Sequence, residues 1–448
     1  MTNASFPAPA APDKGRLILF ASGDFAFNLY WQSVMLYLLY YYTEALHLSI
    51  AVASLGYALA SVWDGVASLV VGVLADRIGR PERFRLALTL GAIPLGLSFI
   101  LAYAPPPVSA EWQVGWILAG HMIFRTAYAL VNIPYLAMSS RISVYSDDRA
   151  FVAGARMLFG TVAAVVVAIG TVPVGQFLTG ENGSHAYFAS AIAFAAFGSL
   201  LLLLVGISYR DDGSIPSAKF DHRITKIVGH VGRNRAFLAI SGAVMAMIVA
   251  VTVLDKSVLY YFKYALHDED AGRLTLGWMM AISGIAIPFW LALSRRLGAR
   301  NVWFLAIFAC VGCLCVFIGY AFERALPVQI FLIVVQGSIV GLHFAFWAIL
   351  PDTVEYGQRQ SGFRAEAILY GLSALFQRLA IGLGTLLVGI GLGGDGLHHA
   401  DASDAAYKLV LAFIPLGFFL LAGLAMLANP LFRDSHSQIL SELRNKDV

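Results

Sequence analysis

Charged residues are scarce in this sequence: 13% of its 448 residues are Asp, Glu, Lys or Arg, whereas 59% are hydrophobic. A water-soluble protein of this size carries roughly 25% charged residues, which cover its surface. A soluble globular fold is therefore excluded, and so is a disordered chain. The net charge of +3 is too small to indicate a nucleic-acid partner.

Cysteine is also rare, and the motifs of several protein classes are missing. The 3 cysteines, Cys310, Cys313 and Cys315, lie in one apolar run, so we expect packing residues rather than disulfides or metal ligands. No glycine-rich phosphate loop of the G-x-x-x-x-G-K-[ST] type is present, which excludes an ATP-driven motor of that type. No spacing of catalytic residues rises above chance, so we predict a protein that is not an enzyme and has no cofactor or metal.

Long runs of hydrophobic residues are abundant in this sequence. A helix needs about 20 mainly apolar residues to cross a bilayer. Twelve such runs are present, at 17–43, 49–74, 86–104, 112–139, 151–178, 186–208, 236–263, 274–294, 301–321, 328–350, 365–391 and 405–428. The long polar break at 209–235 separates the sixth from the seventh. We predict an all-α membrane protein with an N-terminal six-helix half (1–208), an inter-half loop (209–235), and a C-terminal half with a short charged tail (236–448).

The basic residues indicate how the chain is oriented, because Lys and Arg concentrate on the cytoplasmic side. With the N-terminus inside, 22 of the 30 Lys and Arg residues lie on the inner side. Only Lys263, Arg273, Arg324 and Lys408 lie on the outer side. We therefore predict that both termini and the loop at 209–235 are cytoplasmic, and that the protein lies in the plasma (inner) membrane.

Two six-helix halves joined by a cytoplasmic loop are typical of secondary transporters, which bind substrate near the midplane between the halves. The segment from Gly72 to Arg80 reads G-V-L-A-D-R-I-G-R. It resembles the G-x-x-x-D-R-x-G-R signature that the major facilitator superfamily carries between its second and third helices. The resemblance implies the major facilitator fold.

Further segments resemble one branch of that superfamily, the glycoside–pentoside–hexuronide:cation symporters, the group that includes melibiose permease. They are Gly-Asp-Phe at 23–25, Tyr-Tyr-Tyr-Thr-Glu at 40–44, Trp-Asp at 63–64, Asn-Ile-Pro-Tyr at 132–135, Gly-Ala-Arg at 154–156 and Leu-Pro-Asp-Thr-Val-Glu-Tyr-Gly at 350–357. The matches extend over nearly the whole chain. The resemblance implies transport of a sugar, a glycoside or a uronide.

Three side chains of the first span form one polar and aromatic face. Asp24, Asn28 and Trp31 are spaced at i, i+4 and i+7, on one side of a helix. A sugar offers hydroxyl groups for hydrogen bonds and an apolar ring face for stacking, which suit a carboxylate, an amide and an indole. We predict that this face binds substrate. The alternative is that Asp24 forms a structural pair with a basic residue of the fourth or fifth span.

The fourth and fifth spans supply further candidates. His121, Arg125, Tyr128 and Asn132 lie along one helical stripe, and Arg156 stands near the start of the fifth span. An ionisable group at the bilayer centre costs at least about 2.5–3.5 kcal/mol, so each needs a partner or a function. We predict Arg125, Tyr128, Asn132 and Arg156 as substrate-binding residues.

The resemblance supports this set in part. In the related symporters an Asp of the first span, an Asp of the fourth and an Arg of the fifth hold the sugar. This chain has Asp24 and Arg156 at two of these positions, but Asn132 in the fourth span. The difference puts a specificity for galactosides in doubt.

The second half offers two residues opposite this face. Trp347 shares one helical face with Gln336 and His343 in the tenth span. Arg378, in the eleventh span, stands where the related permeases carry a cavity-facing Lys. We predict that Trp347 and Arg378 bind substrate from the second half, and that Arg378 bridges to an aspartate of the first half. Asp255 and Lys256 are neighbours in the seventh span and are not expected to pair with each other, since adjacent helical residues diverge by about 100°. For Lys256 two alternatives stay open: it reaches a carboxylate elsewhere, or it lines the cavity.

The second span contains the candidate residue for coupling transport to a cation. Related symporters with cation coupling carry two Asp residues four apart there, whereas this chain has only Asp64, followed by Ser68. A sodium ion stripped of water needs several oxygen ligands, while a proton needs one carboxylate. We therefore predict proton coupling through Asp64, or uncoupled transport, rather than sodium coupling. The alternative is a permanent salt bridge between Asp64 and an arginine of a neighbouring span.

The sequence thus predicts a secondary active transporter for a sugar, a glycoside or a uronide that functions as a monomer in the lipid bilayer. Two alternatives stay open. One is transport of a non-sugar amphiphile or aromatic compound on the same fold. The other is a membrane sensor that binds its ligand without translocating it.

Overall fold

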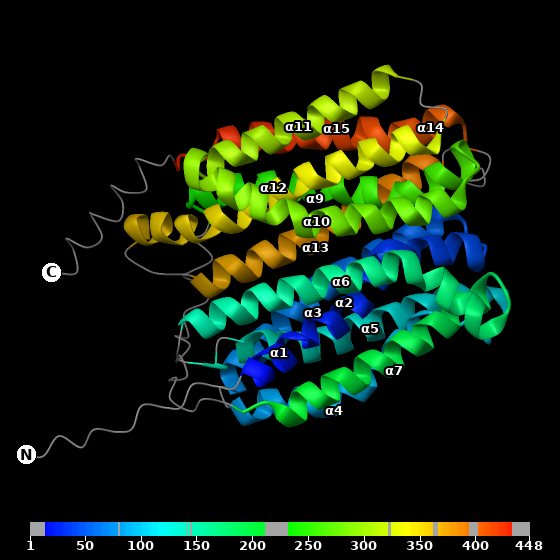
Figure 1. Cartoon of the computed structure of the whole chain (residues 1–448), viewed down its shortest axis with the longest axis horizontal. Coiled ribbons are helices and arrows are strands. Elements are labelled where there is room, and N and C mark those ends of the chain that lie inside the picture. The colour runs from blue at the N-terminus through cyan, green and yellow to red at the C-terminus, as the bar shows by residue number, and fades with distance from the viewer. Residues whose placement is uncertain are drawn as a thin grey trace, which may run out of the picture.

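The computed structural model describes residues 14–78, 81–139, 141–143, 146–210, 232–320, 324–361, 366–393 and 402–431. These residues are almost wholly helical and contain no strand, so the predicted all-α class is confirmed. Figure 1 shows two groups of helices that lie side by side, the blue-to-green N-terminal half and the green-to-red C-terminal half.

The two halves contain corresponding sets of helices. The N-terminal half consists of α1 (Lys14–Ala21), α2 (Gly23–Ser33), the π-helical turns η1 (Val34–Leu38) and η2 (Tyr41–Ala45), α3 (Ile50–Ile78), α4 (Pro81–Ala102), α5 (Ala110–Ser139), α6 (Ser146–Thr179) and α7 (Ser184–Ser208). The C-terminal half consists of α9 (Arg235–Tyr260), η3 (Tyr261–Ala265), α10 (Glu269–Leu297), α11 (Ala299–Gly319), α12 (Ala325–Ser361), α13 (Glu366–Leu392), α14 (Asp404–Lys408), η6 (Leu409–Phe413) and α15 (Ile414–Leu427).

Within the described chain, 11 helices are long and apolar enough to cross a membrane. The first span completes the set of twelve, but it is not the single helix predicted over 17–43. A turn at Ser22 separates α1 from α2, and η1 and η2 continue the span in π-helical form. A π-turn departs from the i→i−4 pattern of main-chain hydrogen bonds, and such turns are frequent at functional sites.

Several spans extend beyond the predicted runs. α12 continues to Ser361, whereas hydrophobicity predicted an end at residue 350. Hydropathy marks the apolar part of a helix, and the helix itself continues into polar residues beyond it. The predicted inter-half loop falls mainly on residues 211–231, and the motif at 72–80 ends on residues 79–80; both stretches lie outside the described residues. The domain boundaries at 208 and 235 therefore stay a prediction.

The two halves meet along two helix pairs, α3 with α13 and α6 with α10. Glycines allow the backbones to approach closely there. A Cβ on Gly389 of α13 would lie 1.9 Å from Oγ of Ser54 on α3, and a Cβ on Gly277 of α10 would lie 2.3 Å from Cγ2 of Ile169 on α6. Helices in a membrane associate mainly through such close van der Waals packing, because lipid tails are as apolar as the side chains.

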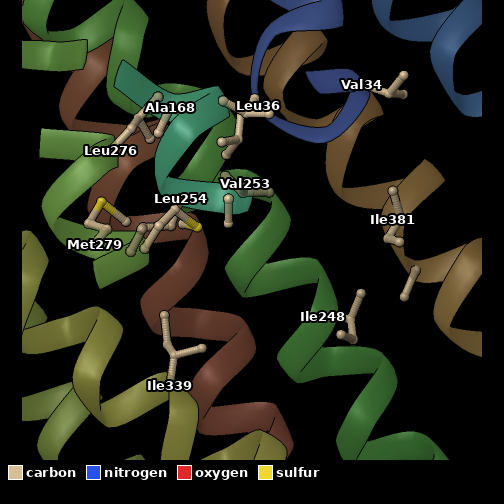
Figure 2. Close-up of a cluster of buried hydrophobic side chains, with 14 of the residues drawn as sticks. Val34, Leu36, Ala168, Ile248, Val253, Leu254, Leu276, Met279, Ile339 and Ile381 are labelled. Atoms are coloured by element: carbon tan, nitrogen blue, oxygen red, sulfur yellow. The ribbon is translucent and has the colours of Figure 1, made fainter. Parts of the chain in front are cut away.

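Buried apolar side chains from both halves form one cluster at this junction. Figure 2 labels Val34 and Leu36 of η1, Ala168 of α6, Ile248, Val253 and Leu254 of α9, Leu276 and Met279 of α10, Ile339 of α12 and Ile381 of α13. The cluster joins the end of the first span to the C-terminal half.

Polar contacts also join the halves where the first and seventh spans end; we call this the Glu44 end of the bundle. The Thr43 and Tyr260 hydroxyls are 2.7 Å apart. Glu44 forms an ion pair with Lys263 and accepts a hydrogen bond of 2.7 Å from Tyr264. The first span is therefore tied to the seventh span at this end of the bundle.

Candidate functional site

Asp24, near the start of α2, is the centre of a first polar cluster. It forms an ion pair with Arg156 of α6, and the two side chains are 15% and 18% exposed. The Tyr135 hydroxyl of α5 lies 2.9 Å from both Asp24 Oδ2 and the main-chain oxygen of Phe20. Gly23 makes room for this arrangement, because a Cβ there would lie 2.8 Å from the Tyr135 ring. The ion pair is thus held in place by a tyrosine, and both side chains are partly exposed. The alternative interpretation of Asp24, a pair with a basic residue of the fifth span, is present in this conformation.

Asn28 extends this cluster by one turn of α2. Its Nδ2 donates to the main-chain oxygen of Asp24 at 2.8 Å. Among the described residues none donates a hydrogen bond to its Oδ1, and the side chain is half-buried. Gly160 of α6 lies opposite, where a Cβ would be 3.0 Å from Asn28 Nδ2. The amide oxygen is thus available to a ligand hydroxyl.

Asp64 of α3 is the centre of a second cluster, which includes both halves. Its Oδ2 accepts from Arg125 Nη1 of α5 at 3.3 Å and pairs with Arg378 Nε of α13 at 3.0 Å. Its Oδ1 lies 3.5 Å from the Ser68 hydroxyl. The predicted contact between Arg378 and an aspartate of the first half is therefore present. The alternative interpretation of Asp64, a salt bridge to an arginine of a neighbouring span, is present in this conformation as well.

Arg125 is fully engaged inside the protein. It is 1% exposed, and besides Asp64 it donates to His121 Nε2 at 3.1 Å and to the Tyr57 hydroxyl at 3.3 Å. All of its nitrogens thus have protein partners. In this conformation Arg125 holds Asp64 in place and does not face a substrate, so its predicted role in binding stays a prediction.

Trp31, on the same helix as Asp24, contacts the second cluster. The guanidinium carbons of Arg125 and Arg378 lie 4.8 and 4.0 Å from its ring centroid. The Tyr128 ring lies 5.4 Å away, centroid to centroid. Trp31 is seven residues from Asp24, which corresponds to about 10 Å along the helix axis. The predicted stripe of the first span therefore connects an accessible ion pair to a group of stacked cations.

Lys256 of α9 has a partner that sequence reasoning did not find. Its Nζ donates to the main-chain oxygen of Met35 in η1 at 3.0 Å, and it lies 3.8 Å from the centroid of the Tyr57 ring. The Tyr57 hydroxyl is 3.3 Å from the oxygen of Val34 in the same π-turn. In this π-helical turn the Met35 carbonyl accepts from Lys256 of the other half, and the Val34 carbonyl accepts from Tyr57. The Oδ1 of Asp255 has no hydrogen-bond partner among the described residues.

Two predicted residues are not drawn into either cluster. Asn132 of α5 is half-buried, and Trp347 of α12 is 54% exposed, with its ring 4.9 Å from that of Phe346. Within the described chain, neither makes a hydrogen bond, ion pair or ring contact with the residues of the two clusters. Their roles in substrate binding stay predictions.

Sequence reasoning missed Tyr57 and assigned no role to Tyr135. Tyr57 precedes Asp64 by seven residues, so both lie on one face of α3. Tyr135 lies three residues after Asn132 and continues the polar stripe of α5. Helical spacing therefore contained a signal for both, although it did not identify their partners.

Comparison with known proteins gives consistent matches. A family model described as MFS/sugar transport protein matches residues 19–432. An isoprimeverose transporter from Lactiplantibacillus pentosus is 25% identical, over 91% of this chain and 87% of its own length. A glucuronide carrier protein homolog from Escherichia coli (strain K12) is 24% identical, over 96% of this chain and 95% of its own length.

Solved structures agree on the fold. A bacterial homologue of the human lysosomal transporter Spinster, in an inward-facing and unoccupied conformation, superimposes with a TM-score of 0.67 and 15% sequence identity. The match covers 94% of this chain and 98% of that one. At this identity the likeness concerns the fold alone.

Proposed function

Because this chain belongs to the MFS/sugar transport family, we propose that it is a secondary transporter that moves a sugar, a glycoside or a uronide by alternating access. The observation that carries the proposal is the accessible Asp24–Arg156 pair, which continues through Asn28 to Trp31 along one face of the first span. Carboxylate, guanidinium and amide groups bind hydroxyls, and an indole stacks against a sugar ring. The relatives named as an isoprimeverose transporter and a glucuronide carrier protein homolog support the same substrate class.

The proposed substrate site contains residues from both halves. It comprises Asp24, Asn28, Trp31, Arg125, Tyr128, Asn132, Arg156, Trp347 and Arg378. Helix pairs with close glycine contacts join the halves, which suits transporters in which one half rocks against the other around a central site. The contacts at the Glu44 end favour a conformation closed at that end.

For coupling, we propose that Asp64 carries a proton and that sodium is not the coupling ion. Two guanidinium groups within 3.3 Å already occupy the carboxylate oxygen Oδ2. A sodium ion would have to displace them, and the Ser68 hydroxyl is the one side-chain oxygen of the described residues that is hydrogen-bonded to the carboxylate. A proton needs no such cage, and in the proposed cycle it binds when Arg378, which lies in the other half, moves away from the carboxylate. Uptake that rises steeply with sodium at fixed pH and membrane potential would contradict this proposal.

The proposed orientation places both termini in the cytoplasm of a monomer in the inner membrane. The distribution of basic residues supports it, because only Lys263, Arg273, Arg324 and Lys408 lie in loops or helix ends on the outer side. The Glu44 end of the bundle then faces outward.

Counterflow in proteoliposomes tests the function. Vesicles loaded with an unlabelled sugar or glycoside should take up the same labelled compound when the protein is present. Asp24→Asn should abolish this exchange, because it removes the charge that pairs with Arg156. The matched control is Asp404→Asn, which changes an exposed aspartate at the start of α14. Binding without exchange would identify a sensor, and exchange of amphiphiles but not of sugars would contradict the proposed substrate class.

A further inference from the structure

Lys256 joins the second cluster through Tyr57, whose ring it contacts and whose hydroxyl accepts a hydrogen bond from Arg125. With Lys256 included, the cluster contains three cationic side chains: Arg125, Lys256 and Arg378. Among the described residues, Asp64 is the only carboxylate that bonds to any of them. Even if Asp255, the residue before Lys256, is counted as charged, the cations exceed the carboxylates by one. Uncompensated charge within a membrane is costly. The described side chains of this cluster therefore leave one positive charge without a matching carboxylate.

The three cations differ in what they leave open. Arg125 uses all of its nitrogens on protein partners. Lys256 is 4% exposed, and its amine is bonded to a main-chain oxygen. Arg378 is 26% exposed and engages only its Nε with Asp64. No residue of the described chain accepts a hydrogen bond from its Nη1 or Nη2. Its guanidinium carbon lies over the Trp31 ring, 4.0 Å from the centroid, and this contact restricts the orientation of the open edge.

We propose that this open edge of Arg378 binds a carboxylate on the substrate, so that the protein selects sugar acids over the neutral sugars of the same stereochemistry. The inference rests on the proposed function and names the substrate class of the same site. Two parallel N–H groups match the two oxygens of a carboxylate, and such bidentate pairs are among the strongest hydrogen-bonded contacts. The ligand carboxylate supplies the negative charge that the cluster lacks.

The first cluster then binds the other end of the same ligand. Asp24 and Arg156 are partly exposed, and Asp24 lies about 10 Å along the helix axis from Trp31. A sugar acid with its carboxylate at Arg378 extends its hydroxyl groups toward this pair. Asn28, between the two clusters, offers its amide oxygen to a further hydroxyl.

Matched pairs of ligands test the inference. We suggest glucuronate with glucose, galacturonate with galactose, and phenyl β-D-glucuronide with phenyl β-D-glucoside, since the members of each pair differ only at C6. Affinity is measured by ligand-induced thermal shift and by inhibition of counterflow with purified full-length protein. In every pair that binds, the acid should bind roughly ten- to hundredfold more tightly, the ratio that a hydrogen-bonded charge contact supplies.

Two outcomes overturn different claims. If a neutral sugar binds as tightly as its acid, the inference about Arg378 is wrong, and the proposed sugar transport stands. If no member of any pair binds or exchanges, the proposed function is contradicted as well. If the acid binds more tightly than the neutral sugar in each pair that binds, both the proposed function and the inference about Arg378 are supported.

Variants assign the preference to Arg378 itself. Arg378→Gln should bring the acid-to-neutral affinity ratio close to one, and Arg378→Lys should leave an intermediate ratio, because it keeps the charge but loses the planar donor edge. Arg296→Gln, at an exposed position near the end of α10, is the matched control and should keep the full ratio. If purified Arg378→Gln is not monodisperse, the affinity ratio of Arg378→Lys alone decides whether Arg378 causes the preference for the acid. A variant of Arg378 with the unchanged wild-type ratio would overturn the proposal.

Discussion

Replacing Asp64 with Asn removes the charge that Arg125 and Arg378 share while preserving the size of the side chain. In the native structure Asp64 and Arg125 are each 1% exposed, whereas Arg378 is 26% exposed. After the change Arg378 can turn toward water, but Arg125 cannot. The substitution therefore strands one buried cation among His121, Tyr57 and the rings that surround it.

The size of the effect follows from that difference in burial. Breaking a buried ion pair by removing one partner costs about 3–5 kcal/mol, because the remaining charge is uncompensated. We expect Asp64→Asn to fall near the lower end, about 3 kcal/mol, since the amide oxygen still accepts a hydrogen bond. The double variant with Arg125→Gln should regain at least half of this loss, because the stranded charge is then absent.

Chemical unfolding of the purified protein in detergent, followed by tryptophan fluorescence, measures these differences. Ser68→Ala is the control: its hydroxyl is 3.5 Å from Asp64, and its loss should change stability by no more than about 0.5 kcal/mol. Equal stabilities for Asp64→Asn and Ser68→Ala would refute the reasoning. So would a double variant whose loss is the sum of the two single losses.

The same Asp64→Asn variant tests the coupling proposal in vesicles. Counterflow should persist, because it needs no net movement of protons. Accumulation driven by an imposed pH gradient should disappear. Accumulation at the wild-type level would remove Asp64 as the coupling residue.

Two further predictions concern the junction between the halves. Gly389→Ala should destabilise the protein and slow transport, because the new Cβ would lie 1.9 Å from Ser54 Oγ. Adding Ser54→Gly to this variant should restore stability and transport. Gly56→Ala is the neutral control, because no atom lies within 4 Å of its new Cβ. Glu44→Gln removes the ion pair with Lys263, which should cost about 1 kcal/mol or less because the lysine is 32% exposed. The equilibrium should therefore shift a few-fold toward conformations in which the halves are separated at the Glu44 end. Distances between spin labels on the two halves measure this shift, and an unchanged distribution would show that the pair does not hold that end closed.

Hydrophobic run length and the spacing of polar residues within a helix were enough to predict much of this molecule. Both depend on local geometry: about 20 apolar residues span a bilayer, and i, i+4, i+7 positions share one face. The twelve spans and the stripe of Asp24, Asn28 and Trp31 were found in this way. The high cost of charge in a membrane also directed attention to Asp64, Arg125, Arg156 and Arg378 before any partner was known.

The partners themselves were decided only by the tertiary structure. Arg125 is 61 residues from Asp64 in sequence, and Arg378 lies in the other half of the chain. The tilt and rotation of each helix determine which charged side chains of different helices come into contact. Both follow from packing across the whole bundle.

The π-turns of the first span also could not be predicted from local sequence. No local pattern indicated that the Met35 carbonyl would bind Lys256. The sequence by itself determined that this is a membrane protein of twelve spans with a few costly buried charges. The structure decided how these charges are shared. Within the described part of the chain, Arg378 is the cation of the second cluster that keeps an open edge, because packing between helices sets which nitrogen atoms are already bonded.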